Sequence, residues 1–281
     1  MGNLFSAGLY RLLRNKLFYV GLGIMALLQV YLLESDKDAL LASDLGLESS
    51  FFSFPMALTI GIAAFSGLFL GGEYSGGSLR NRLTVGYRKH TVYLANLALS
   101  TAVSIAFSLA ATAVGLCYGY LRVASFHLSA DQVAWYLICS LGVAVASASL
   151  STLISMNLSH WAVGIVVSVV LAFALLFAAQ FVMELMAAPK MIPHTTRIED
   201  PSGRVFYQID WDKPKMANPM YLEGPLRSAV FFLWDFLPAC QCFQLAFLQI
   251  TRPVLLVGYS ALFTLLTTGV GLALFQHKDI K

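Results

Sequence analysis

The densest group of side chains able to do chemistry lies in one short polar stretch, residues 71–90. Glu73 opens it, and the cations Arg80, Arg82 and Arg88 follow at short spacing. Guanidinium groups hold carboxylates through paired, charge-assisted hydrogen bonds. The stretch is therefore typical of a docking site for a partner with an acidic surface. A cationic anchor at a membrane surface, without any partner, is the alternative.

A short helix is expected within this stretch. Glycine pairs flank its start and permit sharp turns, and Ser78 is a suitable N-cap. Leu79 and Leu83, four residues apart, then share one face. We expect this apolar ridge to face outward, flanked by cations, and to fit a groove on the partner.

Catalytic and metal chemistry is not indicated elsewhere. The five histidines are scattered among polar segments, so no zinc site is expected. A phosphate-binding Gly-x-x-x-x-Gly-Lys-Ser/Thr run does not occur in the sequence, so the chain is not expected to bind a nucleotide or another cofactor itself. A membrane enzyme would need a nucleophile, a base or a metal cluster, and we identify none.

The elements that must position the polar stretch are membrane spans. Hydrophobic residues make up 58% of the 281 residues and charged residues only 12%, about half the usual charged share of about 25% in soluble domains. Long stretches free of Lys, Arg, Asp and Glu are wide enough for helices of roughly 20 apolar residues. The six expected spans are 17–33, 51–70, 91–120, 133–154, 161–183 and 253–275.

Orientation follows from the distribution of Lys and Arg in short loops. The N-terminal segment, the stretch 71–90 and the C-terminal tail are basic, whereas the loop after the first span is acidic. Both termini are therefore expected in the cytoplasm, which requires an even number of spans. The apolar and basic faces of residues 1–16 predict an interfacial helix; simple flanking charge is the alternative.

Residues 184–252 are then external. Two β-prone runs, 195–199 and 204–209, flank a turn tetrad and predict a β-hairpin. Two short apolar pieces follow, and they are interrupted by Asp235, Pro238 and Gln241. Each piece is too short to span, so two re-entrant helices are expected rather than a seventh span.

The spans carry hydroxyl and amide groups instead of charges. Thr59 and Ser66 lie in the second span and Gln180 in the fifth. They are candidates for lining a mildly amphiphilic path, with helix packing as the alternative. An ion-coupled transporter would need ionisable groups at membrane depth, and the spans have none.

The stretch 71–90 resembles the cytoplasmic loop of ABC-2 type permeases, most closely those of bacterial lantibiotic and bacitracin exporters. The residues that carry the resemblance are Glu73, Gly77, Ser78, Leu79, Arg80, Asn81, Arg82, Leu83, Gly86, Arg88, Tyr93 and Leu94. A second match lies outside, at Asn218, Pro219, Tyr221, Gly224, Arg227, Asp235, Leu237, Pro238 and Gln241, and a third is the basic tail 275–281. Gly76, Ser78 and Tyr87 depart mildly from the family pattern.

This resemblance implies an all-α integral membrane protein with six transmembrane helices. An elbow helix over 1–16 would precede the spans of 17–183, and an external domain over 184–252, with a β-hairpin and re-entrant helices, would precede the last span and tail, 253–281. Two such chains, identical or related, form the membrane unit. Two separate ABC ATPase subunits bind ATP and Mg below them and use the loop 71–90 for coupling.

The family therefore implies an exporter permease in the bacterial plasma membrane, moving an amphiphilic substrate such as an antimicrobial peptide. Arg80 and Arg82 would contact the ATPase, and Glu73 would fix the loop to neighbouring helix ends. The runner-up is a peptide-sensing or immunity subunit that binds its ligand through the external domain without transporting it.

Overall fold

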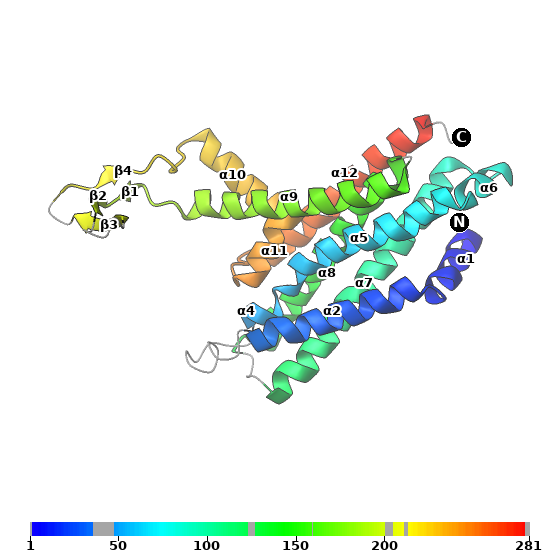
Figure 1. Ribbon diagram of the computed structural model, residues 1–281, viewed down its shortest axis with the longest axis horizontal. Helices are drawn as coiled ribbons and strands as arrows, with labels where there is room; N and C mark the ends of the chain where they lie inside the picture. The colour runs from blue at the N-terminus through cyan, green and yellow to red at the C-terminus, as the bar shows by residue number, and fades with distance from the viewer. Residues whose placement is uncertain are drawn as a thin grey trace.

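Six helices are long and apolar enough to cross a membrane, which confirms the predicted number of spans in a computed structural model of the chain (Figure 1). The structure describes residues 2–35, 48–122, 127–158, 160–199, 205–210 and 213–278. The six helices are α2 (Lys16–Ser35), α5 (Phe54–Ser75), α7 (Lys89–Arg122), α8 (Ala130–Asn157), α9 (Trp161–Ala187) and α12 (Pro253–His277). The protein is thus a multi-pass membrane protein.

The shorter elements gather at opposite ends of this bundle. Helices α1 (Gly2–Leu13) and α6 (Ser78–Thr84) lie beside both chain termini, at what we call the termini end (Figure 1). Helices α4 (Glu48–Phe51), α10 (Pro225–Phe236) and α11 (Pro238–Ala246) lie at the other end with the strands, at the hairpin end. The basic stretch and the segment 184–252 are therefore separated by the length of the bundle.

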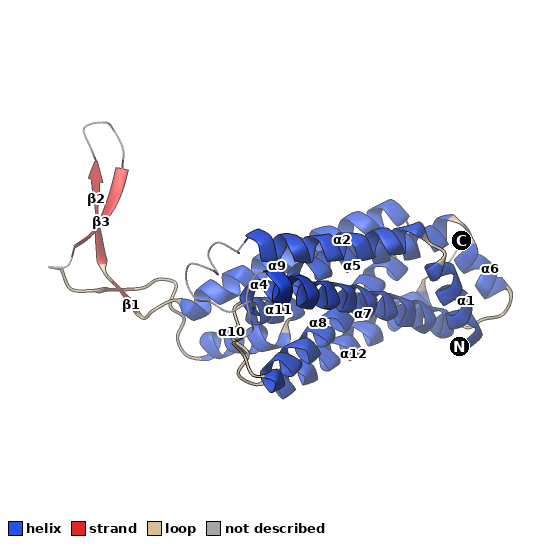
Figure 2. Ribbon diagram, turned by 90° about the horizontal axis from the view of Figure 1, so that it is seen from below, coloured by secondary structure: helices blue, strands red, loops and turns tan. Residues whose placement is uncertain are grey.

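Two small antiparallel pairs extend from the hairpin end. Strand β1 (Met191–Ile192) pairs with β4 (Met216–Ala217), and β2 (His194–Glu199) pairs with β3 (Val205–Asp210). His194 lies opposite Asp210 in the longer pair, whereas the predicted turn tetrad, 200–203, falls outside the described residues. Figure 2 shows this ribbon standing away from the helices.

Helices α5 and α8 form the centre of the bundle, and α9 and α12 form its outside. In their most apolar windows α5 and α8 are 67% and 61% buried, whereas α9 and α12 are only 22% and 17% buried although they too are strongly apolar. Helix α5 contacts α2, α7, α8 and α9. Exposed apolar helices of this kind match a hydrocarbon surrounding, where burial inside the protein is not required.

Close helix contacts depend on glycine at several places, two of which fix the helices on either side of α6. A Cβ atom on Gly67 of α5 would lie 2.8 Å from the Cα of Ile165 in α9, and one on Gly271 of α12 would overlap the Tyr93 ring of α7. Small residues let membrane helices approach in this way. They fix the positions of α5 and α7, the two helices that carry α6 between them.

Helices α10 and α11 meet at a bend of 79°. Pro238 begins α11, where its missing N–H is not needed. Together the two helices have the length and composition of a seventh span, but the bend makes them a broken or re-entrant segment. Every residue of α11 is buried, so α11 lies inside the protein at the hairpin end, whereas Trp234 is the buried residue of α10.

Candidate functional site

Helix α6 is fixed in place by its apolar residues, not by a side-chain cap. Gly77, with φ of 66°, occupies the N-cap position, so the expected cap by Ser78 is wrong. A left-handed conformation suits glycine. Leu79 is only 1% exposed and joins the main core, and Leu83 packs against that core. The prediction that this ridge faces outward is therefore also wrong: it faces the bundle, where apolar burial is available.

The surface that α6 presents is instead basic with one apolar residue. Arg80 and Arg88 are exposed, and Val85, next to the end of α6, is 78% exposed. Val85 was not singled out from the sequence, because it lies outside the Leu79–Leu83 face. This surface, formed by Arg80, Val85 and Arg88, is named the α6 surface below.

Arg82 differs from Arg80 in its surroundings. Its side chain is 15% exposed, and its Nη2 lies 2.9 Å from Glu73 Oε1. Its Nη1 also donates to Glu73 Oε2 at 3.3 Å. The guanidinium is thus held inside the chain by two hydrogen bonds to one carboxylate, and it contributes less to the α6 surface than the sequence predicted.

Glu73 is the buried centre of a polar cluster that we call the Glu73 network, formed with Arg82, Asn96 and the partly exposed Arg11. The carboxylate is 1% exposed, pairs with Arg11 Nη2, and accepts a hydrogen bond of 2.9 Å from Asn96 Nδ2. These partners come from α1, α6 and α7, while Glu73 itself ends α5. One carboxylate therefore fastens three other elements to α5.

The charges in this network do not balance. One carboxylate faces the guanidiniums of Arg11 and Arg82, which leaves one positive charge in excess. Arg11 also lies over the ring of Phe69, 4.7 Å from its centroid, in a cation–π contact. Its Nε is buried without a hydrogen-bond partner among the described residues. The excess charge adds to the basic potential of the α6 surface.

A second polar cluster, the Gln241 network, holds the α10–α11 bend. Gln241 Nε2 donates to the carbonyl of Asp235 at 2.7 Å, and Ser260 Oγ donates to Gln241 Oε1 at 2.6 Å. Gln244 Nε2 donates to the carbonyl of Trp234 at 2.7 Å and lies 3.4 Å from Asp235 Oδ1. Asp235, Pro238 and Gln241 are thus brought together, as a structural joint.

The three residues proposed to line a path lie in different surroundings. Thr59 borders an apolar cavity between α5, α8 and α9. Ser66 is 1% exposed, and its Oγ has no hydrogen-bond partner among the described residues. Gln180 donates to Glu184 at 3.3 Å on the half-exposed face of α9. The three side chains are not brought together at one site.

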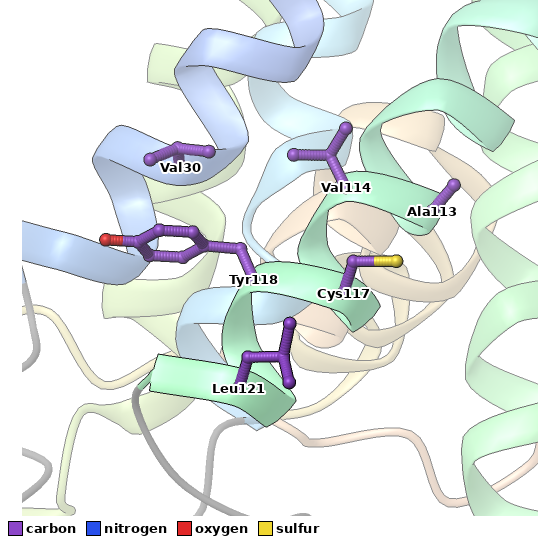
Figure 3. A pocket seen from close by; sticks show the side chains of 6 residues that line it. All are labelled: Val30, Ala113, Val114, Cys117, Tyr118 and Leu121. Atoms are coloured by element: carbon purple, nitrogen blue, oxygen red, sulfur yellow. The ribbon is translucent and has the colours of Figure 1, made fainter.

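An open groove of about 510 Å³ lies between α2 and α7 (Figure 3). Val30 borders it from α2, and Val114, Tyr118 and other residues border it from α7. The Tyr118 hydroxyl donates to Glu34 at 2.8 Å. The lining is almost wholly apolar apart from the Tyr118 hydroxyl and the Cys117 thiol, so the groove offers a packing surface.

The segment outside the bundle has its own ion pairs. Lys190 donates to Glu223 at 2.8 Å, which raises the pKa of Lys190 and lowers that of Glu223. Arg227 lies 4.4 Å from the centroid of the Tyr221 ring. Lys190 and Glu223 are solvent-exposed, so their ion pair orders the base of the strands but contributes little to stability.

Comparisons with known proteins give no assignment: no family model matches this chain, and no curated protein matches it significantly. The likeness to ABC-2 type permeases therefore remains a hypothesis based on sequence motifs. The geometry of the termini end is the remaining guide to function. That geometry combines an exposed basic surface with a buried carboxylate that links it to three other elements.

Proposed function

We propose that this chain is the membrane-spanning subunit of an ATP-driven exporter of the ABC-2 permease class. The observation that carries the proposal is the Glu73 network, which ties the α6 surface to α1, α5 and α7. A partner that moves α6 thereby moves the ends of two spans. This is the arrangement that a subunit driven from outside needs.

The partner's chemistry follows from the α6 surface. Arg80 and Arg88 would bind carboxylates of an ABC ATPase subunit, which holds ATP and Mg, and Val85 would fill an apolar depression between them. By the distribution of Lys and Arg, the termini end faces the cytoplasm, where ATP is available. The membrane would then be the bacterial plasma membrane, and α1 would be the interfacial elbow helix.

The substrate and the second permease chain are proposed from the same family likeness. An exposed apolar face on α2 supports an assembly of two chains, identical or related, in which a seam opens to lipid. A seam without charges suits an amphiphilic substrate such as an antimicrobial peptide. The strands would then stand outside the cell as an external domain.

Affinity purification in mild detergent tests the ATPase partner. Wild-type protein should retain an ABC ATPase subunit, identified by mass spectrometry from its own P-loop sequence, in stoichiometric amount. The double variant Arg80→Glu/Arg88→Glu should lose it, because both exposed cations become anions. Lys213→Glu/Lys215→Glu, with the same change in net charge at the hairpin end, is the matched control. Equal ATPase recovery with both variants, or none with wild type in two detergents, would refute the proposal.

A second candidate function is peptide sensing or immunity without transport. The ribbon at the hairpin end favours it, because Met191, Phe206 and Met216 are each at least 42% exposed on strands that stand away from the bundle (Figure 2). Such strands can bind an extended peptide. Binding of a fluorescent cationic amphiphilic peptide that is lost when 194–210 is replaced by a Gly-Ser linker, with no ATP-driven movement in vesicles, would favour this function.

A further inference from the structure

A partly open apolar cavity of about 180 Å³ lies beneath the α10–α11 bend. Pro238 borders it from the bend, Leu171 from α9, Phe263 from α12, and Ala146 from α8. Thr59 of α5 lies at its inner wall. The cavity thus has a wall from each of the four helices and a cover from the re-entrant segment.

The cavity is suited to an apolar occupant and not to water. Its two hydroxyl groups are already engaged: Thr59 Oγ1 donates to the carbonyl of Pro55 at 3.0 Å and lies 3.1 Å from Ser147 Oγ. A buried water needs two to four polar partners. The remaining surface is almost entirely hydrocarbon, so a water molecule there would lack them.

The gap between α9 and α12 is the route that helix packing leaves from the membrane toward the cavity. These two helices both pack on α8 and α10 but make little contact with each other. Side chains, not a close-packed helix pair, therefore separate the cavity from lipid. A track of aromatic rings reaches the same place from the hairpin end, since Phe232 stacks on Phe236 at 5.2 Å and Phe236 meets Phe263 at 5.8 Å.

We propose that this cavity binds the methyl end of an acyl chain, supplied by a phospholipid of the leaflet at the hairpin end, which enters between α9 and α12. The size fits, because an engineered dry cavity of about 150 Å³ in another protein holds benzene. The depth fits as well, because Leu171 and Phe263 lie near the middle of their helices, where acyl chains end. Occupation of the cavity does not require the protein to transport anything.

Photolabelling of the full chain in phosphatidylcholine vesicles tests this site. A fraction of the lipid carries a diazirine near the methyl end of one chain, and labelled residues are located by mass spectrometry after irradiation. Leu171 and Phe263 should be labelled together with lipid-facing residues such as Leu265, which is 69% exposed. The same lipid with the diazirine near the glycerol should leave Leu171 and Phe263 unlabelled.

Filling the cavity provides the decisive variant. In Ala146→Phe, labelling of Leu171 and Phe263 should fall about tenfold, as expected when about two methylene groups can no longer be buried, while labelling of Leu265 persists. Ala174→Phe adds the same ring on the exposed face of α9. It should change neither the labelling of Leu171 and Phe263 nor that of Leu265. If Ala146→Phe does not fold, Ala146→Leu replaces it as the cavity-filling variant, because leucine is smaller.

Two outcomes would overturn the proposal. Unlabelled Leu171 and Phe263 in wild-type protein would mean that the cavity is empty or covered by a second copy of the chain. Unchanged labelling of both residues in a folded Ala146→Phe or Ala146→Leu variant would mean that the chain reaches them from outside the cavity.

Discussion

The Glu73 network and the Gln241 network perform the same structural task with different groups. Each fastens a short helix to long ones through buried polar side chains. The first uses a carboxylate and two guanidiniums, whereas the buried members of the second are the amides of Gln241 and Gln244 and the hydroxyl of Ser260. Its one carboxylate, Asp235, is only half-buried.

Depth in the bundle accounts for the difference. Glu73 lies at the very end of α5, where headgroups and water are close, while Ser260 lies well inside α12 and bonds to an α11 that is wholly buried. A charge at apolar depth is penalised far more than an amide that finds its partners. Glutamine also supplies donors and an acceptor in one side chain, so it can join several elements without any net charge.

Glu73→Gln gives the largest expected effect. The change keeps the shape but leaves the guanidiniums of Arg11 and Arg82 without their shared anion, and loss of one partner in a buried ion pair costs about 3 kcal/mol or more. Thermal unfolding in detergent should show a large drop in midpoint, with α1 released first. Arg80→Gln, which removes an exposed charge of the α6 surface, is the control and should stay near wild type. Equal midpoints for the two variants would break the comparison.

Gln241→Leu should have a smaller effect. The leucine fills similar space but leaves Ser260 Oγ and the carbonyl of Asp235 without their partner, which costs about 2 kcal/mol. Gln241→Glu should destabilise further, because it places a buried charge beside the carboxylate of Asp235, and no cation among the described residues is hydrogen-bonded to Gln241 to pair with it. Gln249→Leu, at an exposed position just after the end of α11, isolates the network's contribution. A Gln241→Glu variant as stable as wild type would contradict the explanation that depth in the bundle excludes a charge at this position.

Lys278 gives the smallest effect, through pH. Its ammonium donates to the carbonyl of Met156 at 3.2 Å, and burial lowers its pKa from 10.5 to about 8. Between these values the unfolded chain binds more protons than the folded chain, so stability rises with pH. The free energy of unfolding of wild type, relative to that of Lys278→Met, should increase between about pH 7 and about pH 10. The increase should be on the order of 1 kcal/mol after solvent screening. Parallel curves would show that the side chain carries no burial penalty.

The spans were predictable because one physical signal dominates them. Long gaps without Lys, Arg, Asp or Glu have few explanations other than hydrocarbon, and the six helices match these gaps. The direction of the α6 ridge was not predictable, because the Leu79–Leu83 spacing defines a face but not what covers it. Either a partner protein or the protein's own core could cover this ridge, and in the structure the core covers it.

The two polar networks left unequal signals in the sequence. Glu73 is the only acidic residue between Glu48 and Asp131, so pairing with a nearby arginine could have been inferred from its isolation. Its pairing with Arg11, 62 residues away, has no local signal. The bond between Gln241 and Ser260 could not be predicted either, because Ser260 looks like the other serines of the spans. The cavity could not be predicted from any one segment, because it forms only where four helices meet.

The unequal lengths of α2 and α7 set the bilayer thickness that suits this chain. Helix α2 has 20 residues and α7 has 34, which correspond to about 30 Å and about 51 Å, against a hydrocarbon core of about 30 Å. Phe18 stacks on Phe107, so α2 begins halfway along α7, and α1 flanks the surplus at the termini end. A bilayer thicker than that hydrocarbon core would draw the charged Glu73 network toward hydrocarbon, so the mismatch would favour membranes no thicker than α2 is long.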